Sequence, residues 1–306
     1  PLRKELNNIN TPFEEWHLGK RNVDHLDKPP QGVFYNRMSA SAHTRGHRYA
    51  PEYAAVVLNW LEKHNRRVIN NSRALNLEVS KSLQYKELEE FDIKTPKTIY
   101  CNNKESILKS ANIFRKPFIT KHNRGGKGLG VKLFNNKKEL DSHVSSKDFE
   151  PSVDGVTLLQ EYIDAHPKVI IRAEFVNSKF LYAVEVDASD GFELCPACPE
   201  DQIDVPETQF FGEFCPTIGN KFRIIKNYKR SKLIENYEKF IKKNGIEIAG
   251  IEYITDKKGT TYTYDINTNT NYNSQAERNS KIKGMKSIAK FLKEELLFLS
   301  NIKIVA

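Results

Sequence analysis

The sequence lacks any apolar run that could cross a lipid bilayer. Such a span needs about 20 consecutive apolar residues, whereas residues 54–58 are among the longer apolar stretches of this chain. The first residues also lack the charged, apolar and small-residue succession of a secretory signal. We therefore expect a cytoplasmic protein with no membrane partner. The opening residues 1–6 are typical of a helix interior, so we also expect that a segment upstream of Pro1, including a first strand, is absent from this numbering.

Cysteine is scarce, which argues against a disulfide framework. The 306 residues include four cysteines, namely Cys101, Cys195, Cys198 and Cys215. The spacing of Cys195 and Cys198 resembles half of a zinc site, but a structural zinc site takes four ligands and only Cys215 lies nearby. We expect unpaired, reduced thiols, as is usual in the cytoplasm.

Acidic residues are fewer than basic ones, which gives a formal net charge of +9. Such an excess can indicate a nucleic-acid partner. The basic residues are scattered, however, and no long block of Lys and Arg occurs. We favour a general explanation, a coding bias that makes Lys and Asn abundant throughout the chain. A local patch for an anionic substrate such as ATP is a third interpretation. We expect no nucleic-acid partner.

Glycine totals 15 residues, but four of them fall within residues 121–131, together with Lys121, Arg124 and Lys127. Strand-like runs flank this stretch at 117–120 and 131–134. The pattern matches neither the P-loop nor the dinucleotide fingerprint. It predicts a hairpin whose flexible, basic tip can approach phosphate oxygens closely. An ordinary flexible hairpin is the alternative.

Hydrophobic periodicity and the alternation of strands and helices divide the chain into three segments, 1–75, 76–156 and 157–306, and predict a small α/β unit in the first. The predicted strands are 13–17, 32–36, 67–70, 158–162, 169–176, 180–186, 248–254 and 261–266, and residues 94–99 lead into a further strand. The predicted helices are 51–64, one from 76 with Val79, Leu83 and Leu88 on its apolar face, 104–114, 231–243 and 281–299.

The last two predicted strands carry oxygen ligands. Glu252 lies on one strand of a hairpin with its turn at 256–259, and Asp265 and Asn267 lie two residues apart on the partner strand. Side chains two apart on a strand share a face. Carboxylate and amide oxygens suit Mg²⁺ bound to nucleotide phosphates. A solvated hairpin face is the alternative, but a carboxylate among aromatic and β-branched neighbours is costly unless it has a partner.

The ordered set of glycine-rich hairpin, Gln160-Glu-Tyr-Ile163 and the Glu252, Asp265, Asn267 trio resembles the ATP-grasp superfamily, in its RimK-like, glutamate ligase-like branch. The resemblance runs from about residue 75 to 275. It implies an α+β fold with two lobes and antiparallel sheets. Residues 76–156 would form the central lobe with the glycine-rich lid, 157–306 the C-terminal lobe with the metal site, and 1–75 an N-terminal α/β substrate domain. It also implies catalytic roles for Arg172 and Lys121, and Mg²⁺, or alternatively Mn²⁺, on the trio. The ATP contacts that it implies are Lys81, Lys121, Gly125, Gly126, Lys127, Gly128, Glu161, Tyr162 and Ile163.

Three positions depart from the family pattern. Ile170 stands where the family usually has an acid for the ribose, and Asp265 stands where the second metal ligand is usually Glu. Residues 268–273 replace a loop that often reads Pro-Gly and that helps to bind substrate. The ribose contact and the substrate are therefore unassigned.

Residues 36–48 follow a predicted strand and concentrate arginine, histidine and hydroxyl side chains. Ligands of open α/β sheets bind beyond the ends of strands, and arginine can hold an acidic acyl substrate through two hydrogen bonds. A polar loop that caps the next helix is the alternative. The candidate substrate residues are Arg37, Ser39, Ser41, His43, Arg45 and Asn269.

The resemblance implies an ATP-dependent, ADP-forming ligase that joins a carboxylate to an amine through an acyl phosphate. The expected partners are a small-molecule or peptide carboxylate and an amine, and a homo-oligomer is left open. An ATP-binding regulatory or scaffold protein with a degenerate site is the alternative. An RNA binder that also holds zinc ranks last, because it leaves the trio unexplained.

Overall fold

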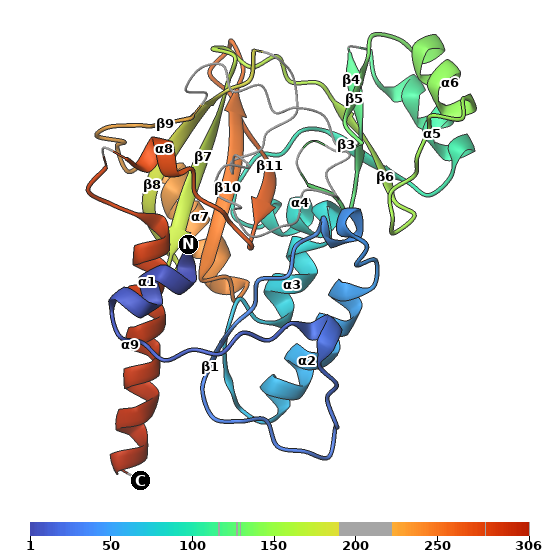
Figure 1. Cartoon of the computed structure of the whole chain (residues 1–306). Helices are drawn as coiled ribbons and strands as arrows, with labels where there is room; N and C mark the ends of the chain where they lie inside the picture. The colour runs from blue at the N-terminus through green and yellow to red at the C-terminus, as the bar shows by residue number, and fades with distance from the viewer. Residues whose placement is uncertain (116, 127, 129, 190–221, 279, 306) are drawn as a thin grey trace.

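The computed structural model describes residues 1–115, 117–126, 128, 130–189, 222–278 and 280–305, and leaves out the side chains of 275 and 301–305 (Figure 1). Helices accompany three sheets: a parallel pair, a four-stranded antiparallel sheet and a five-stranded antiparallel sheet. The predicted α+β class is confirmed. Cys195, Cys198 and Cys215 lie outside the described residues, and Cys101 is buried with a free thiol.

The N-terminal part contains the parallel pair, β1 (Val33–Tyr35) and β2 (Arg67–Ile69). The helix between them, α2 (Ala50–Lys63), buries Ala54, Val57, Leu58 and Leu61 against this pair and α3. The predicted strand at 13–17 is wrong, because these residues form no ladder. Trp16 instead packs edge-on against Phe34 at 5.1 Å between ring centroids. The apolar residues of this segment therefore pack against the core and do not pair with a strand.

The single helix predicted from residue 76 is two helices, α3 (Ser72–Glu78) and α4 (Lys81–Glu89). Each begins at a side-chain cap, since Asn71 accepts bonds from two backbone N–H groups of α3 and Ser80 accepts one from Leu83. Such caps satisfy the free donors of a first turn. The break explains why Leu83, expected on an apolar face, is 45% exposed.

The four-stranded sheet has the order β3-β6-β4-β5, with all neighbours antiparallel. Its strands are β3 (Thr98–Cys101), β4 (Phe118–His122), β5 (Lys132–Phe134) and β6 (Thr157–Glu161). Helices α5 (Lys104–Ser110) and α6 (Lys137–Ser145) pack on it around Phe118, Phe134 and Leu140. β6 thus pairs with the central sheet, although the predicted boundary at 156/157 assigned it to the C-terminal lobe. The rest of the three-part division stays a prediction.

The five-stranded sheet has the order β11-β10-β7-β8-β9. Its strands are β7 (Val169–Val176), β8 (Lys179–Asp187), β9 (Phe222–Ile224), β10 (Ile248–Thr255) and β11 (Thr261–Asn267). Asn177 and Ser178 join β7 to β8 with φ of 54° at both positions, as a type I′ hairpin turn requires. The predicted turn at 256–259 is also found, closed by the Asp256 carboxylate on two backbone N–H groups.

The main core lies between this sheet and α7 (Lys232–Lys243), whose Ile234, Tyr237, Phe240 and Ile241 are fully buried on one face. The short α8 (Ser274–Glu277) precedes the long C-terminal α9 (Gly284–Val305). α9 runs beside the N-terminal α1 (Leu2–Asn8), and Ile288 and Phe291 of α9 pack on Ile248 at the start of β10 (Figure 1). Within the described part, no helix has the length and apolar character to cross a membrane.

Candidate active site

Lys121 lies on β4, where residues 118–121 are all buried, and it is 7% exposed. Its ammonium donates to the Tyr264 carbonyl at 2.9 Å and lies 4.9 Å from the centroid of the Tyr264 ring. Burial lowers the pKa of Lys121 below its usual 10.5, although the charges of Asp265 and Glu252 act to raise it. A strand of one sheet thereby places a cation directly against β11 of the other.

A β-bulge on β11 frees the backbone carbonyl that accepts the hydrogen bond from Lys121. Tyr253 pairs with Thr263 and Glu252 pairs with Asp265, so Tyr264 is an extra residue without a partner in the ladder. A bulge of this kind frees backbone groups and re-aims side chains. The freed Tyr264 carbonyl also accepts a bond from the Tyr85 hydroxyl at 2.9 Å. The sequence gives no signal for the bulge, because the apolar alternation of β11 continues through it.

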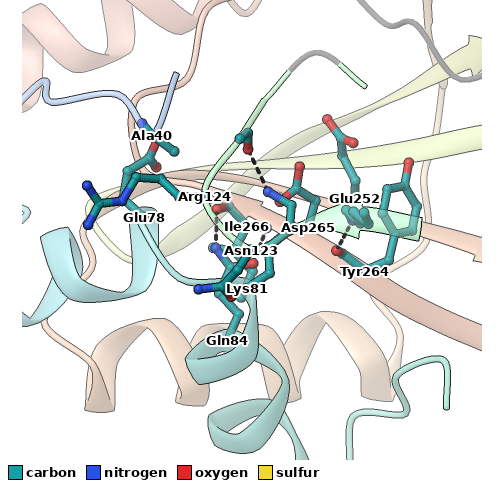
Figure 2. A network of polar contacts seen from close by, with 12 residues as sticks. Ala40, Glu78, Lys81, Gln84, Asn123, Arg124, Glu252, Tyr264, Asp265 and Ile266 are labelled. Atoms are coloured by element: carbon teal, nitrogen blue, oxygen red, sulfur yellow. Dashed lines mark hydrogen bonds and ion pairs between the residues drawn. The ribbon is translucent and has the colours of Figure 1, made fainter. Parts of the chain in front are cut away.

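Lys81 is the first residue of α4 and is 4% exposed. Its ammonium donates to the Gly125 carbonyl at 2.7 Å and lies 3.2 Å from Asp265 Oδ1. Burial acts to raise the pKa of Asp265, but Lys81 and Lys121 outweigh it and hold that pKa below its usual value. Lys81 thus joins helix, hairpin and β11 in one contact (Figure 2).

Gln84, one turn beyond Lys81, fixes α4 on β11. Its amide donates to the Ile266 carbonyl at 2.9 Å and accepts from the Ile266 N–H at 3.0 Å. The side chain is fully buried, so both bonds are protected from water. This clamp sets the register in which Lys81 meets Asp265, and it was not predicted from the sequence.

Arg172 on β7 is 6% exposed and makes three short hydrogen bonds. It donates to Glu174 at 2.6 Å, to Glu252 at 2.7 Å and to Thr270 at 2.7 Å. Burial acts to lower the pKa of Arg172, but the two carboxylates raise it, so the guanidinium stays charged. Burial raises the pKa of Glu174, although Arg172 acts to lower it. Arg172 is therefore locked in one orientation beside Glu252.

Gly250 on β10 leaves the space that this guanidinium fills. A Cβ at Gly250 would lie 2.4 Å from Arg172 Nη2 and 2.6 Å from Nε. Contacts under 3.0 Å are not found for real Cβ atoms. The glycine is therefore required by packing, since its φ lies outside the left-handed range.

The predicted metal trio lies on the facing strands β10 and β11. Glu252 pairs directly with Asp265, and Asn267 follows two residues later on the same face. Three oxygen-bearing side chains on one surface fit a hard divalent cation. Among the described residues, no cluster of three or more His, Cys, Asp or Glu side chains occurs, so any such site needs the Asn267 amide. Each carboxylate also contacts a cation, Lys81 or Arg172.

The glycine-rich hairpin has the predicted form, with β4 and β5 antiparallel around it. Gly128 and Gly130 have φ of 78° and 75°, a region that other L-residues rarely occupy. Lys127 lies outside the described residues. Arg124, expected at a free tip, is instead held at the base of the hairpin, 2.7 Å from Glu52 of α2. Gly126 lies against Ser41, whose Cβ is 3.6 Å from the position of an added Cβ.

The segment after β6 links the two sheets. The Glu161 N–H donates to the Lys97 carbonyl at 2.9 Å, and the Glu161 carboxylate accepts from the Lys97 N–H at 2.7 Å. The Tyr162 N–H donates to the Pro117 carbonyl at 3.0 Å. Ile163 follows in the connection to β7. The segment thus connects β6 to β7, and its contact to adenine stays a prediction.

The candidate substrate residues of segment 36–48 come together with Asn269 after β11. Arg37 donates to Asn269 Oδ1 at 3.2 Å. Ser39 and Ser41 share a hydroxyl hydrogen bond of 3.0 Å, and Arg45 donates to Ser41 at 3.3 Å. His43 contacts the Ala40 carbonyl at 3.2 Å, and burial lowers its pKa. Residues more than 200 positions apart in sequence thus lie side by side.

Two buried polar residues that were not predicted join these segments. Glu78 accepts from the Ala40 N–H at 3.0 Å, and Figure 2 shows these two residues side by side. It also accepts from the Thr268 N–H at 2.6 Å. Asn70, fully buried at φ 55°, holds the start of β10 and the Thr268 carbonyl through its amide. Nothing in the sequence distinguishes this Asn or Glu from other polar residues near a helix. Their function as links between distant segments is visible only from their long-range partners in the structure.

Part of the chain matches the model of a known protein family. Residues 78–193 match the family model of the RimK-like ATP-grasp domain. This part of the chain is therefore similar to a RimK-like ATP-grasp domain. The match begins at Glu78 and spans both lysines, the hairpin, the linker and Arg172, while the predicted metal trio lies beyond it. No curated protein sequence matches the chain.

Solved ATP-grasp structures resemble the chain over most of its length. D-cycloserine synthetase DcsG has a TM-score of 0.63 at 13% identity, with 97% of this chain and 93% of that chain covered. A RimK domain ATP-grasp protein from Sphaerobacter thermophilus has a TM-score of 0.61 at 14% identity, covering 95% and 93%. The ATP-grasp ligase PsnB, complexed with a variant of its minimal precursor, Mg and ADP, has a TM-score of 0.54 at 13% identity, covering 86% and 77%. At these identities the likeness establishes the ATP-grasp fold.

Proposed function

We propose that this protein is an ATP-dependent ligase that joins a carboxylate to an amine and releases ADP and phosphate. The observation that carries the proposal is the buried cluster of Lys81, Lys121 and Arg172 with Glu252 and Asp265, built from α4 and from strands of both sheets. Buried charges are costly unless a function or a partner keeps them. ATP with a divalent cation brings negative charge to the cations and positive charge to the carboxylates, so every charge keeps a partner.

The reaction has two steps, each balanced in atoms. A substrate carboxylate oxygen attacks the γ-phosphorus of ATP, the bond from that phosphorus to the β,γ-bridging oxygen breaks, and ADP leaves. The acyl phosphate then accepts the amine nitrogen at its carbonyl carbon. The carbon–oxygen bond to phosphate breaks, and the amine loses a proton. The products are an amide, ADP and phosphate.

The residues act through position and charge rather than as covalent nucleophiles. Lys81 and Lys121 would hold phosphate oxygens, and Arg172 would lie beside the group in transfer. Glu252, Asp265 and Asn267 would hold Mg²⁺, which when bound neutralises the charge that develops on the phosphates. Mn²⁺ is an alternative ion for the same oxygen ligands.

The hairpin of residues 121–131 would close over the nucleotide. Backbone N–H groups of Gly125, Gly126 and Gly128 can approach phosphate closely because no side chain intervenes. Closure excludes water, which would otherwise hydrolyse the acyl phosphate. The Lys81 contact to the Gly125 carbonyl supports this coupling, since one side chain reaches both the hairpin and Asp265.

A regulatory ATP-binding protein is the second candidate. Ile170 supports it, because this residue stands at the position expected for the ribose acid and is buried in an apolar cluster instead. Such a protein would bind ATP without forming an amide.

An ADP-release screen over paired carboxylates and amines separates the two candidates, with product mass as a second readout. A ligase gives ADP, phosphate and a condensed product only when both substrates are present. Lys121→Ala and Asp265→Ala should each abolish ADP formation and remain folded. Lys257→Ala, on the exposed turn after β10, is the matched control and should keep full turnover. ATP binding without turnover on any pair would favour the regulatory protein.

A further inference from the structure

Arg37 differs from Arg172 and Arg124 in its partners, and like Arg45 it donates to neutral groups. Arg172 and Arg124 both contact carboxylates. Arg37 is exposed and donates to two neutral amide oxygens, Asn269 Oδ1 and Asn271 Oδ1, each at 3.2 Å. Among the described residues, no carboxylate forms an ion pair with it, although its charge acts to lower the pKa of Glu15, whose carboxylate pairs with Arg3. Its positive charge is therefore oriented but not neutralised by these residues.

The loop after β11 is built to hold Arg37 in this orientation. Thr268 and Thr270 are buried, and they bond to Glu78 and Glu174 respectively. Asn269 lies between these two threonines and Asn271 follows the second, and both asparagine side chains point toward Arg37. Alternate residues of an extended segment point to opposite sides. The Thr-Asn-Thr-Asn order thus anchors one side of the loop and presents two acceptors on the other.

The same loop connects Arg37 to the proposed reaction centre. Thr270 accepts from Arg172 Nη2 at 2.7 Å, and Arg172 contacts Glu252 of the metal trio. One loop therefore positions both arginines. Two buried phenols, Tyr35 and Tyr272, adjoin this loop as well, and the Tyr272 hydroxyl has no hydrogen-bond partner among the described residues. The Arg37 guanidinium lies 5.9 Å from the centroid of the Tyr35 ring.

We propose that Arg37 binds a second, non-reacting carboxylate of a substrate, so that one substrate is an amino acid or a dicarboxylic acid. This inference rests on the ligase function proposed above. Arginine has five donors in a rigid fork, and Asn269 and Asn271 engage Nε and Nη2 only. The donors on Nη1 and the second donor on Nη2 form an edge that matches the two oxygens of a carboxylate. The two neutral amides orient the Arg37 guanidinium, and because they carry no charge they do not neutralise it as a protein carboxylate would.

Matched acids and amides test the proposal. The panel pairs each amino acid with its α-carboxamide, and glutarate with its monoamide, in the ADP-release assay. Loss of a hydrogen bond to a charged group corresponds to roughly 1.5–3 kcal/mol, so Arg37→Gln should lower kcat/KM for the free acid by about 10- to 150-fold. The wild-type protein should prefer acid over amide by a similar factor, and Arg37→Gln should remove that preference while KM for ATP stays unchanged. Preference among amino acids or for glutarate then tells which source supplies the carboxylate.

Arg230→Gln is the matched control, because Arg230 is an exposed arginine that pairs with Glu238 on α7. It should leave the acid preference as in wild type. Asn271→Ala should give a smaller loss than Arg37→Gln, since it only loosens the fork. Equal losses of kcat/KM on acids and amides in Arg37→Gln would overturn the proposal.

Phenylglyoxal labelling of Arg37, followed by peptide mass spectrometry, separates this proposal from the ligase function because it needs no turnover. Acids of the panel should slow labelling of Arg37 and their amides should not. Protection without ADP release would uphold carboxylate binding and refute the ligase. ADP release without protection by any acid would overturn the role of Arg37 and leave the ligase in place.

Discussion

Substitution of Gly250 by alanine tests whether Arg172 is as firmly held as its contacts indicate. Alanine in place of glycine within a strand normally stabilises by roughly 0.5–1 kcal/mol. Here the new Cβ would lie 2.4–2.7 Å from the Arg172 guanidinium, which is bonded to Glu174, Glu252 and Thr270. Arg172 must therefore leave its carboxylates, and breaking a buried pair costs about 3–5 kcal/mol. The sign of the change in unfolding free energy thus decides between the two effects.

Urea unfolding measures the stability, and ADP release measures the activity. We expect Gly250→Ala to lose about 3–5 kcal/mol of stability and roughly 10²–10³-fold in kcat, the loss typical of a misplaced charge-stabilising donor. Gly32→Ala is the control, because nothing lies within 4 Å of its added Cβ, and its effect should stay within about 1 kcal/mol.

A double-mutant cycle identifies the cause. In an Arg172→Met background the guanidinium is gone, so Gly250→Ala should become nearly neutral. Additive losses in the double variant would refute the reasoning, because they would show that the alanine acts on the strand rather than on Arg172.

Three further predictions concern stability. The pKa of Lys121 is lowered in the folded protein, so the unfolded state binds more protons between that pKa and 10.5. The free energy of unfolding of wild type, relative to that of Lys121→Met, should therefore rise with pH in this window. A difference that falls with pH in urea unfolding would contradict this. Glu78→Gln should cost about 1–3 kcal/mol, because one of the N–H donors of Ala40 and Thr268 loses its acceptor, whereas Glu89→Gln, on the exposed end of α4, should stay within about 0.5 kcal/mol. Asn70→Gly should lower the free energy of unfolding strongly, because the hydrogen bonds of the Asn70 amide are lost. Asn70→Ala should lower it by about a further 1–2 kcal/mol, because Asn70 has φ 55°. Equal losses in the two variants would show that the backbone conformation carries no strain.

The sequence predicted the elements that follow a strong local pattern. The β7–β8 and β10–β11 hairpins, α7 and the glycine-rich hairpin agree with the expected ranges within a few residues. Their signals are alternation, helical periodicity or a turn sequence, all of which lie within one segment. The strand at 13–17 was wrong because its apolar residues pack on Phe34 without a neighbouring strand to pair with.

The site was predicted only in part, for a similar reason. Lys81 and Asp265 were identified one by one, and their ion pair depends on a clamp by Gln84 that joins residues 182 positions apart. Glu174 was missed because nothing in sequence separates a buried acid from an exposed one on a strand. The bulge at Tyr264 was also missed, since one extra residue does not alter the apolar character of β11.

Transfer of oxygen from the carboxylate substrate to phosphate tests the acyl-phosphate account most directly. The substrate that releases ADP is prepared with both carboxylate oxygens as ¹⁸O, and the products are analysed by mass spectrometry. Because the carboxylate oxygen that attacks phosphorus leaves with it, the account predicts one ¹⁸O atom in each phosphate released and none in the ADP. Condensed product accompanied by unlabelled phosphate, or by labelled AMP, would contradict it.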